Sequence, residues 1–172
     1  VVREAVKTLR EKGLAQGYQG RGTFITDGTA RAARHSLGLM IKIGASEDAN
    51  SLAEAREILE PEIAALAAKR ATKEQREAIR QAVATMETVL NDADAFVEAD
   101  LHFHLTLAHA TQNPLIPSLI DPIVDLLREQ RKNTFRHGGA IRGQAHHKKI
   151  LDAILRRDAE SARAAMRAHL KQ

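Results

Sequence analysis

One stretch of the sequence places polar side chains where the buried face of a helix should be apolar. Residues 96–110 read FVEADLHFHLTLAHA, with Asp100 and His104 four positions apart. On a helix, side chains at this spacing project from the same face. Phe103 and Leu107 mark that face as the interior. A buried carboxylate needs a hydrogen-bonding or charged partner, so this stretch predicts a polar site inside the protein.

Two later histidines occupy inward helix positions in the same way. His147 is followed by apolar residues three, four and seven positions later, so it lies at the centre of an apolar face, whereas His146 lies off that centre. His169 is aligned with Ala162 and Met166 on the last helix of the chain. Both histidines are therefore expected to point into the core.

These side chains form a ligand set that suits a divalent transition metal. The set consists of Asp100, His104, His147 and His169. Oxygen and imidazole ligands without a thiolate favour zinc, with nickel and manganese as alternatives. For any single histidine, a hydrogen bond to a core neighbour is the better explanation. All four residues together predict a metal site.

Composition indicates one aliphatic, helical domain with a small appendage. The chain has 172 residues, of which 44% are hydrophobic and 3% aromatic, and it contains no cysteine. Disulfides and thiolate chemistry are thereby excluded, which fits the reducing cytoplasm, where we expect the protein to reside. No apolar run approaches a membrane span and no signal segment opens the chain, so no membrane partner is expected.

The positive charge is concentrated at the N-terminal end. The first 35 residues hold seven arginines and lysines against three carboxylates, which equals the formal net charge of +4 for the whole chain. The remainder is neutral overall. The basic end is therefore the candidate contact for a polyanion.

The pattern of residues 1–28 is typical of the C-terminal part of a winged helix-turn-helix. An amphipathic basic helix ends near Gly13, and two short β-prone runs follow, joined by Gln19-Gly-Arg-Gly22. In a winged helix, such a helix enters the major groove of DNA, and the hairpin touches the backbone or the minor groove. Alone the pattern is weak, because many hairpins carry Gly-Arg-Gly.

The rest of the sequence predicts a mostly α fold. A connecting helix and linker are expected over residues 29–49, and an antiparallel all-α helical bundle of five or six helices over residues 50–172. Thr72-Lys-Glu-Gln75 is a capping box, and Asp92 or Asp94 can cap the helix that carries Asp100. His137-Gly-Gly is expected to break a helix.

In this order the motifs resemble the GntR family of bacterial transcription regulators, in the branch that has an all-helical FCD effector domain and is similar to the fatty-acid regulator. The resemblance covers almost the whole chain. The residues that carry it are Val2-Arg3-Glu4-Ala5-Val6, Gly20-Arg21-Gly22-Thr23-Phe24, Glu54-Ala55-Arg56, Asp100-Leu-His-Phe-His104, Asn113-Pro114-Leu115, His147-Lys-Lys-Ile150 and Asp158 to Leu170. The family's winged helix has further helices ahead of the position of Val1, so residues 1–28 correspond to its C-terminal part.

The resemblance implies a homodimer that binds a double-stranded DNA operator, usually as a repressor. A small carboxylate or sugar-acid effector would enter the helical domain and release the operator. The four predicted metal ligands match the metal-binding set of relatives one for one. Arg3 matches a recognition-helix residue, and Gly20 with Arg21 matches the tip of the wing.

Arg56 has two explanations. It lies on an apolar stripe, where a charge is costly to bury. The resemblance implies an arginine that faces the effector, and the alternative is an intrahelical ion pair with Glu60.

Two other functions compete with a regulator. A metal with open coordination positions can activate water, so a helical metalloenzyme is one alternative. No His-Glu-x-x-His motif and no Ser-His-Asp or Lys nucleophile arrangement stands out, so we do not expect an enzyme. The other alternative is a dimerisation module in which the metal only staples helices together.

Overall fold

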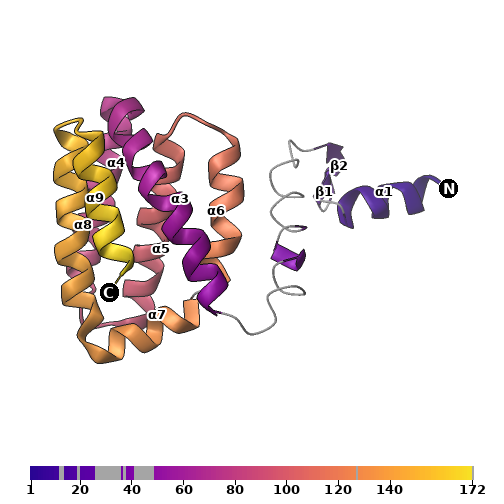
Figure 1. The fold of residues 1–172 in the computed structure, drawn as a ribbon. Coiled ribbons are helices and arrows are strands. Elements are labelled where there is room, and N and C mark those ends of the chain that lie inside the picture. The colour runs from indigo at the N-terminus through magenta and orange to yellow at the C-terminus, as the bar shows by residue number, and fades with distance from the viewer. Residues whose placement is uncertain are drawn as a thin grey trace.

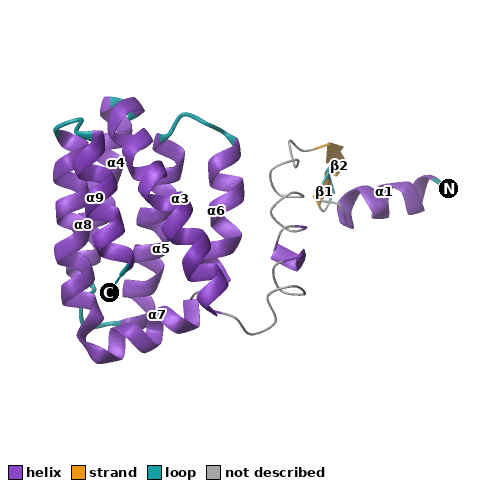
Figure 2. Ribbon diagram, viewed as in Figure 1, coloured by secondary structure: helices purple, strands orange, loops and turns teal. Residues whose placement is uncertain are grey.

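The computed structural model of the chain describes residues 1–11, 14–18, 20–25, 36, 38–40, 49–126 and 128–171. In this part the chain is mostly helical, with one two-stranded antiparallel sheet (Figures 1 and 2). The predicted fold class is therefore confirmed. The predicted connecting helix and linker over residues 29–49 lie largely outside the described residues.

The N-terminal part consists of one helix and one hairpin. Helix α1 spans Val2–Glu11, strand β1 spans Ala15–Tyr18 and strand β2 spans Gly22–Ile25. The strands pair antiparallel, with Ala15 opposite Ile25 and Tyr18 opposite Gly22. The Arg10 guanidinium of α1 lies against Gly17 of β1, where a β-carbon would come within 3.2 Å of it. This contact packs the helix against the hairpin.

Seven α-helices and one π-helical turn make up the described part of the bundle. They are α3 (Ala49–Arg70), α4 (Lys73–Thr88), α5 (Ala93–Ala110), α6 (Leu115–Leu126), α7 (Arg128–Thr134), the π-helix η1 (Phe135–Gly139), α8 (Ala140–Leu155) and α9 (Ala159–Leu170). Helix α3 packs against α9 and α5, and α4 packs against α5 and α8. Helix α7 runs across one end of the bundle (Figure 1).

Side-chain caps fix where α4, α5 and α9 begin. The capping box at Thr72 is confirmed, because its hydroxyl accepts from Gln75 N at 3.2 Å and its own N–H donates to the Gln75 side chain at 3.0 Å. Of the two candidates for α5, Asp92 is the cap. Asp158 caps α9 in the same way. The helices that carry Asp100, His104 and His169 therefore start at defined residues.

The glycines after His137 interrupt the α-helix, as the sequence predicted. Helix α7 ends at Thr134 and α8 begins at Ala140, and Gly138 between them has φ +77°, outside the right-handed helical region. The residues between the two helices, Phe135–Gly139, form the π-helical turn η1. Pro122 lies inside α6, which spans Leu115–Leu126.

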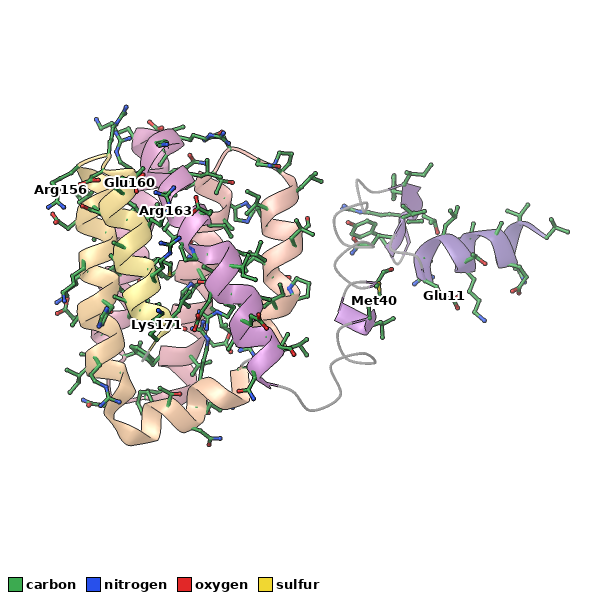
Figure 3. The ribbon with its side chains drawn as sticks, viewed as in Figure 1. Glu11, Met40, Arg156, Glu160, Arg163 and Lys171 are labelled. Carbon is green, nitrogen blue, oxygen red and sulfur yellow. The ribbon has the colours of Figure 1, made fainter. Side chains whose placement is uncertain are left out.

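An ion pair at the surface joins α3 to α9. The Arg163 guanidinium donates two hydrogen bonds to Glu62, at 2.6 and 2.8 Å. It also pairs with Glu160, which lies beside it at the upper end of α9 in Figure 3.

Among the described residues, no helix is long and apolar enough to cross a membrane.

Substitution of Ile150 tests the contribution of the core to stability. Its side chain is fully buried, whereas Ile141 on the same helix is 73% exposed. Ile150→Ala removes buried methyl groups and leaves a cavity, so it should lower the free energy of unfolding by about 2–5 kcal/mol. Ile141→Ala should change it by no more than about 0.5 kcal/mol. Urea unfolding of both variants measures this, and equal losses would contradict the packing of α8.

Candidate metal centre

The four predicted ligands come from three helices and meet inside the bundle. Asp100 and His104 project from α5, His147 from α8 and His169 from α9. One potential ligand atom of each residue lies within 4.8 Å of the corresponding atom of every other. Three of the four side chains are buried, and His169 is partly buried. The four residues that the sequence placed on inward helix faces therefore lie close together in the structure.

The distances between ligand atoms fit a common metal ion. His147 Nε2 lies 3.3 Å from His169 Nε2 and 3.1 Å from Asp100 Oδ1. His104 Nε2 lies 3.7 Å from the same Asp100 oxygen. Ligand atoms at the usual zinc distance in a tetrahedral site are separated by roughly 3.4 Å. The cluster can therefore hold an ion with little rearrangement.

Burial keeps the three imidazoles neutral. It is the main cause that lowers the pKa of His147 and of His169 well below the ordinary value, and nearby positive charge acts in the same direction. Burial also lowers the pKa of His104, although Glu60 acts against it. A metal binds the neutral form of histidine. The donor set therefore fits a divalent cation.

Glu60 lies next to the cluster, on α3, and is only 2% exposed. Its Oε2 atom contacts His104 Nδ1, and its Oε1 atom accepts a hydrogen bond from Arg56 Nε. Burial raises the pKa of Glu60, but Arg56 and His104 together outweigh it and hold the pKa well below its usual range. Glu60 is therefore an ionised carboxylate in the core.

Arg56 forms the intrahelical ion pair that was one of its two explanations, and it also lines a cavity, while contact with an effector stays a prediction. The ion pair with Glu60 is present. The guanidinium also lines a cavity beside the cluster, and its Nη2 atom lies 3.4 Å from His104 Nε2. The ion pair with Glu60 holds the Arg56 side chain through Nε. The Nη2 atom therefore points toward the cluster.

The cavity has a volume of about 150 Å³. Its polar lining comes from Arg56, Asp100, Arg131, Thr134 and His169. Phe96 and Phe135, with ring centroids 5.7 Å apart, form an apolar wall.

Arg131 is a site residue that the sequence analysis missed. It comes from α7, is 13% exposed, and forms an ion pair with Asp100 Oδ2. Helix α7 reads REQRKNT, which is polar throughout, so no apolar stripe distinguishes the inward position. The contact of Glu60 with His104 was also missed. The spacing of four residues places Arg56 and Glu60 on one face of α3, but it gives no information on a contact with another helix.

The predicted DNA-binding residues lie on the N-terminal part. Arg3 is exposed on α1, a helix without any buried residue. Arg21 is exposed in the hairpin turn, which is closed by a hydrogen bond from Arg21 N to Tyr18 O at 3.0 Å. Gly20 in this turn has φ +74°, a conformation that favours glycine.

Comparisons with known proteins agree with the motifs. The FCD domain family matches residues 51–172. The chain is 32% identical to the HTH-type transcriptional regulator LutR of Bacillus subtilis (strain 168), over 98% of this chain and 80% of that protein. It is also 32% identical to the Uxu operon transcriptional regulator of Escherichia coli (strain K12), over 99% of this chain and 69% of that protein.

A solved structure, Streptococcus agalactiae GntR, has a similar fold. The TM-score is 0.74 at 26% identity, and the match covers 99% of this chain and 78% of that one. The fold is thus consistent with part of a winged helix followed by a helical FCD domain. The chain belongs to the GntR family of transcription regulators and carries an FCD domain.

Proposed function

We propose that this GntR-family chain forms a homodimeric repressor that senses a small carboxylate or sugar acid through a divalent metal, zinc in the first place. The observation that carries the proposal is the cluster of one carboxylate and three imidazoles beside a small cavity lined by two arginines. When bound, the metal would supply a Lewis-acid attraction for a carboxylate or hydroxyl oxygen.

The charges of the site favour an anionic effector. Arg56 is paired with Glu60, and Arg131 is paired with Asp100. The three histidines are neutral, so the site without metal is close to electrically balanced. A divalent cation adds positive charge to a buried region, where unpaired charge is costly. An acid in the cavity offsets that charge, so metal and acid should support each other's binding.

Arg56 is placed to orient such an acid. Glu60 holds its Nε atom, and the guanidinium lines the cavity. A planar guanidinium can donate parallel hydrogen bonds to a carboxylate. One relative, 28% identical, is named the galactonate operon transcriptional repressor of Escherichia coli (strain K12). Galactonate is a sugar acid, and the name supports both the effector class and repression.

Release of DNA requires that the effector distinguish two arrangements of the dimer. A ligand with equal affinity for both arrangements shifts nothing. Residues 29–43 join the basic helix and hairpin to the helical domain in the chain, and we propose that this segment carries the change. The acid must favour the arrangement that fits the operator less well.

Metal content tests the first part of the proposal. Protein purified without chelator should carry about one divalent ion per chain. His147→Ala should reduce this content far more than His146→Ala, because only His147 belongs to the cluster. Elemental analysis measures both. Content well under half an equivalent with no uptake of added metal would refute the site, and equal losses would show that the wrong histidine was assigned.

Salt-dependent operator binding tests the DNA contacts. In protein that includes the complete winged helix, Arg3→Ala and Arg21→Ala should each weaken operator binding, because both side chains are exposed on the basic part. Loss of a phosphate contact should also reduce the salt slope by about one. Lys171→Ala, which removes an exposed positive charge from the bundle, is the matched control. Unchanged binding of the arginine variants at all salt concentrations would remove them from the interface.

Calorimetry with candidate hydroxy and sugar acids tests the effector site. An acid that acts through the metal and Arg56 should bind metal-loaded protein more tightly than chelated protein. Arg56→Lys should weaken binding, because the charge remains but the planar guanidinium is lost. By linkage, the acid must change operator affinity by the same factor by which the operator changes acid affinity.

Other results would favour the alternatives. An acid that binds all three proteins equally would place the effector elsewhere. Chemical conversion of the acid would indicate a metalloenzyme. Metal binding without affinity for any acid would indicate a metal-stapled dimerisation module.

A further inference from the structure

Glu60 is a buried carboxylate that the set of four ligands does not include. It belongs to α3, a helix that contributes none of those ligands. Its Oε2 atom contacts His104 Nδ1. The two atoms form an ion-pair contact, and neither has a hydrogen-bond partner elsewhere among the described residues.

The neighbours of His104 select one tautomer of its ring. A carboxylate can only accept hydrogen bonds, so Nδ1 must carry the hydrogen. A neutral imidazole has one N–H group, which leaves a lone pair on Nε2. On that side the ring meets Arg56 Nη2 at 3.4 Å, and a guanidinium can only donate. Two separate neighbours therefore require the same tautomer.

The selected tautomer is the one that a metal needs. His104 Nε2 lies 3.7 Å from Asp100 Oδ1, on the side of the ring that faces the other ligands. We infer that Glu60 is a positioning residue of the metal centre, which holds the His104 ring with its Nε2 lone pair directed at the ion. This inference rests on the metal binding proposed above. Arg56 completes the arrangement, because its Nε–H holds the other oxygen of Glu60.

Such a partner changes both orientation and basicity. A carboxylate that accepts a hydrogen bond from the non-coordinating nitrogen of a ligand histidine fixes the orientation of the ring and makes the other nitrogen a stronger metal ligand. Loss of the carboxylate typically lowers metal affinity 10–100-fold. His147 Nδ1 has no hydrogen-bond partner in the described part of the chain, so that ring lacks a comparable carboxylate. The geometry of His104 should therefore depend on α3 through Glu60.

Long-range 1H–15N correlation spectra of histidine-labelled protein test the tautomer directly. In chelated wild-type protein, His104 should be in the Nδ1–H form, with its signals assigned by their loss in His104→Gln. In Glu60→Gln the amide can donate or accept, so a mixture of tautomers should appear. An Nε2–H tautomer in the wild type would overturn the inference, and this measurement needs neither metal nor a Glu60 variant.

Zinc affinity, measured by competition with a chromophoric chelator, tests the consequence. Glu60→Gln should bind zinc about 10–100-fold more weakly than the wild type. Glu57→Gln, the same change at an exposed position of α3, should match the wild type. Equal zinc affinity of wild type and Glu60→Gln would overturn the positioning role. A wild type that binds no zinc would refute the proposed metal instead, and the tautomer would then decide whether Glu60 fixes His104.

Discussion

The contact of Glu60 with Arg56 and His104 is the constraint on which the interior of the bundle depends. A buried carboxylate is tolerated only when charged or hydrogen-bonding groups surround it, and both oxygens of Glu60 have such partners. The second buried carboxylate, Asp100, is satisfied in the same way by Arg131 and His147. Buried ion pairs are often no more stabilising than well-packed apolar side chains. Stability alone therefore gives little reason for this polar interior, whereas the proposed binding of a cation and an anion would give a direct one.

The polar interior also requires that each surrounding helix be rotated so that its polar side chains point inward. With 3.6 residues per turn, a shift of one residue rotates a side chain by about 100° and would turn a ligand out of the cluster. The caps at Asp92 and Asp158 define where α5 and α9 begin, and the burial of Phe103 and Met166 holds the inward faces of these helices. Helix capping and core packing thus position these side chains, and no unusual backbone conformation is needed at Asp100, His104, His147 or His169.

This regularity explains how much of the site could be predicted. In a long amphipathic helix the spacing of the apolar residues shows which side faces the core. This spacing alone was enough to predict the four clustered residues. Arg131 could not be found, because α7 is polar along its whole length and its inward side depends on how it crosses the end of the bundle. The contact of Glu60 with His104 joins two helices, and sequence spacing reports only on contacts within one. The glycines after His137, by contrast, gave a sufficient local signal, because Gly138 adopts a positive φ between the end of α7 and the start of α8.

Helix α3 connects the centre to the rest of the molecule. It provides Arg56 to the cavity and Glu60 to His104. Through Glu62 it is also tied to Arg163 of α9, the helix that carries His169. Displacement of α3 therefore alters the support of one ligand directly and moves against the helix of another. Helix α3 is the first helix of the bundle in the sequence, after the segment that joins the bundle to the basic helix and hairpin. Under the proposed function, coupling between binding sites is reciprocal. An operator that favours one position of α3 would then change metal and effector affinity by the same factor by which metal and effector change operator affinity.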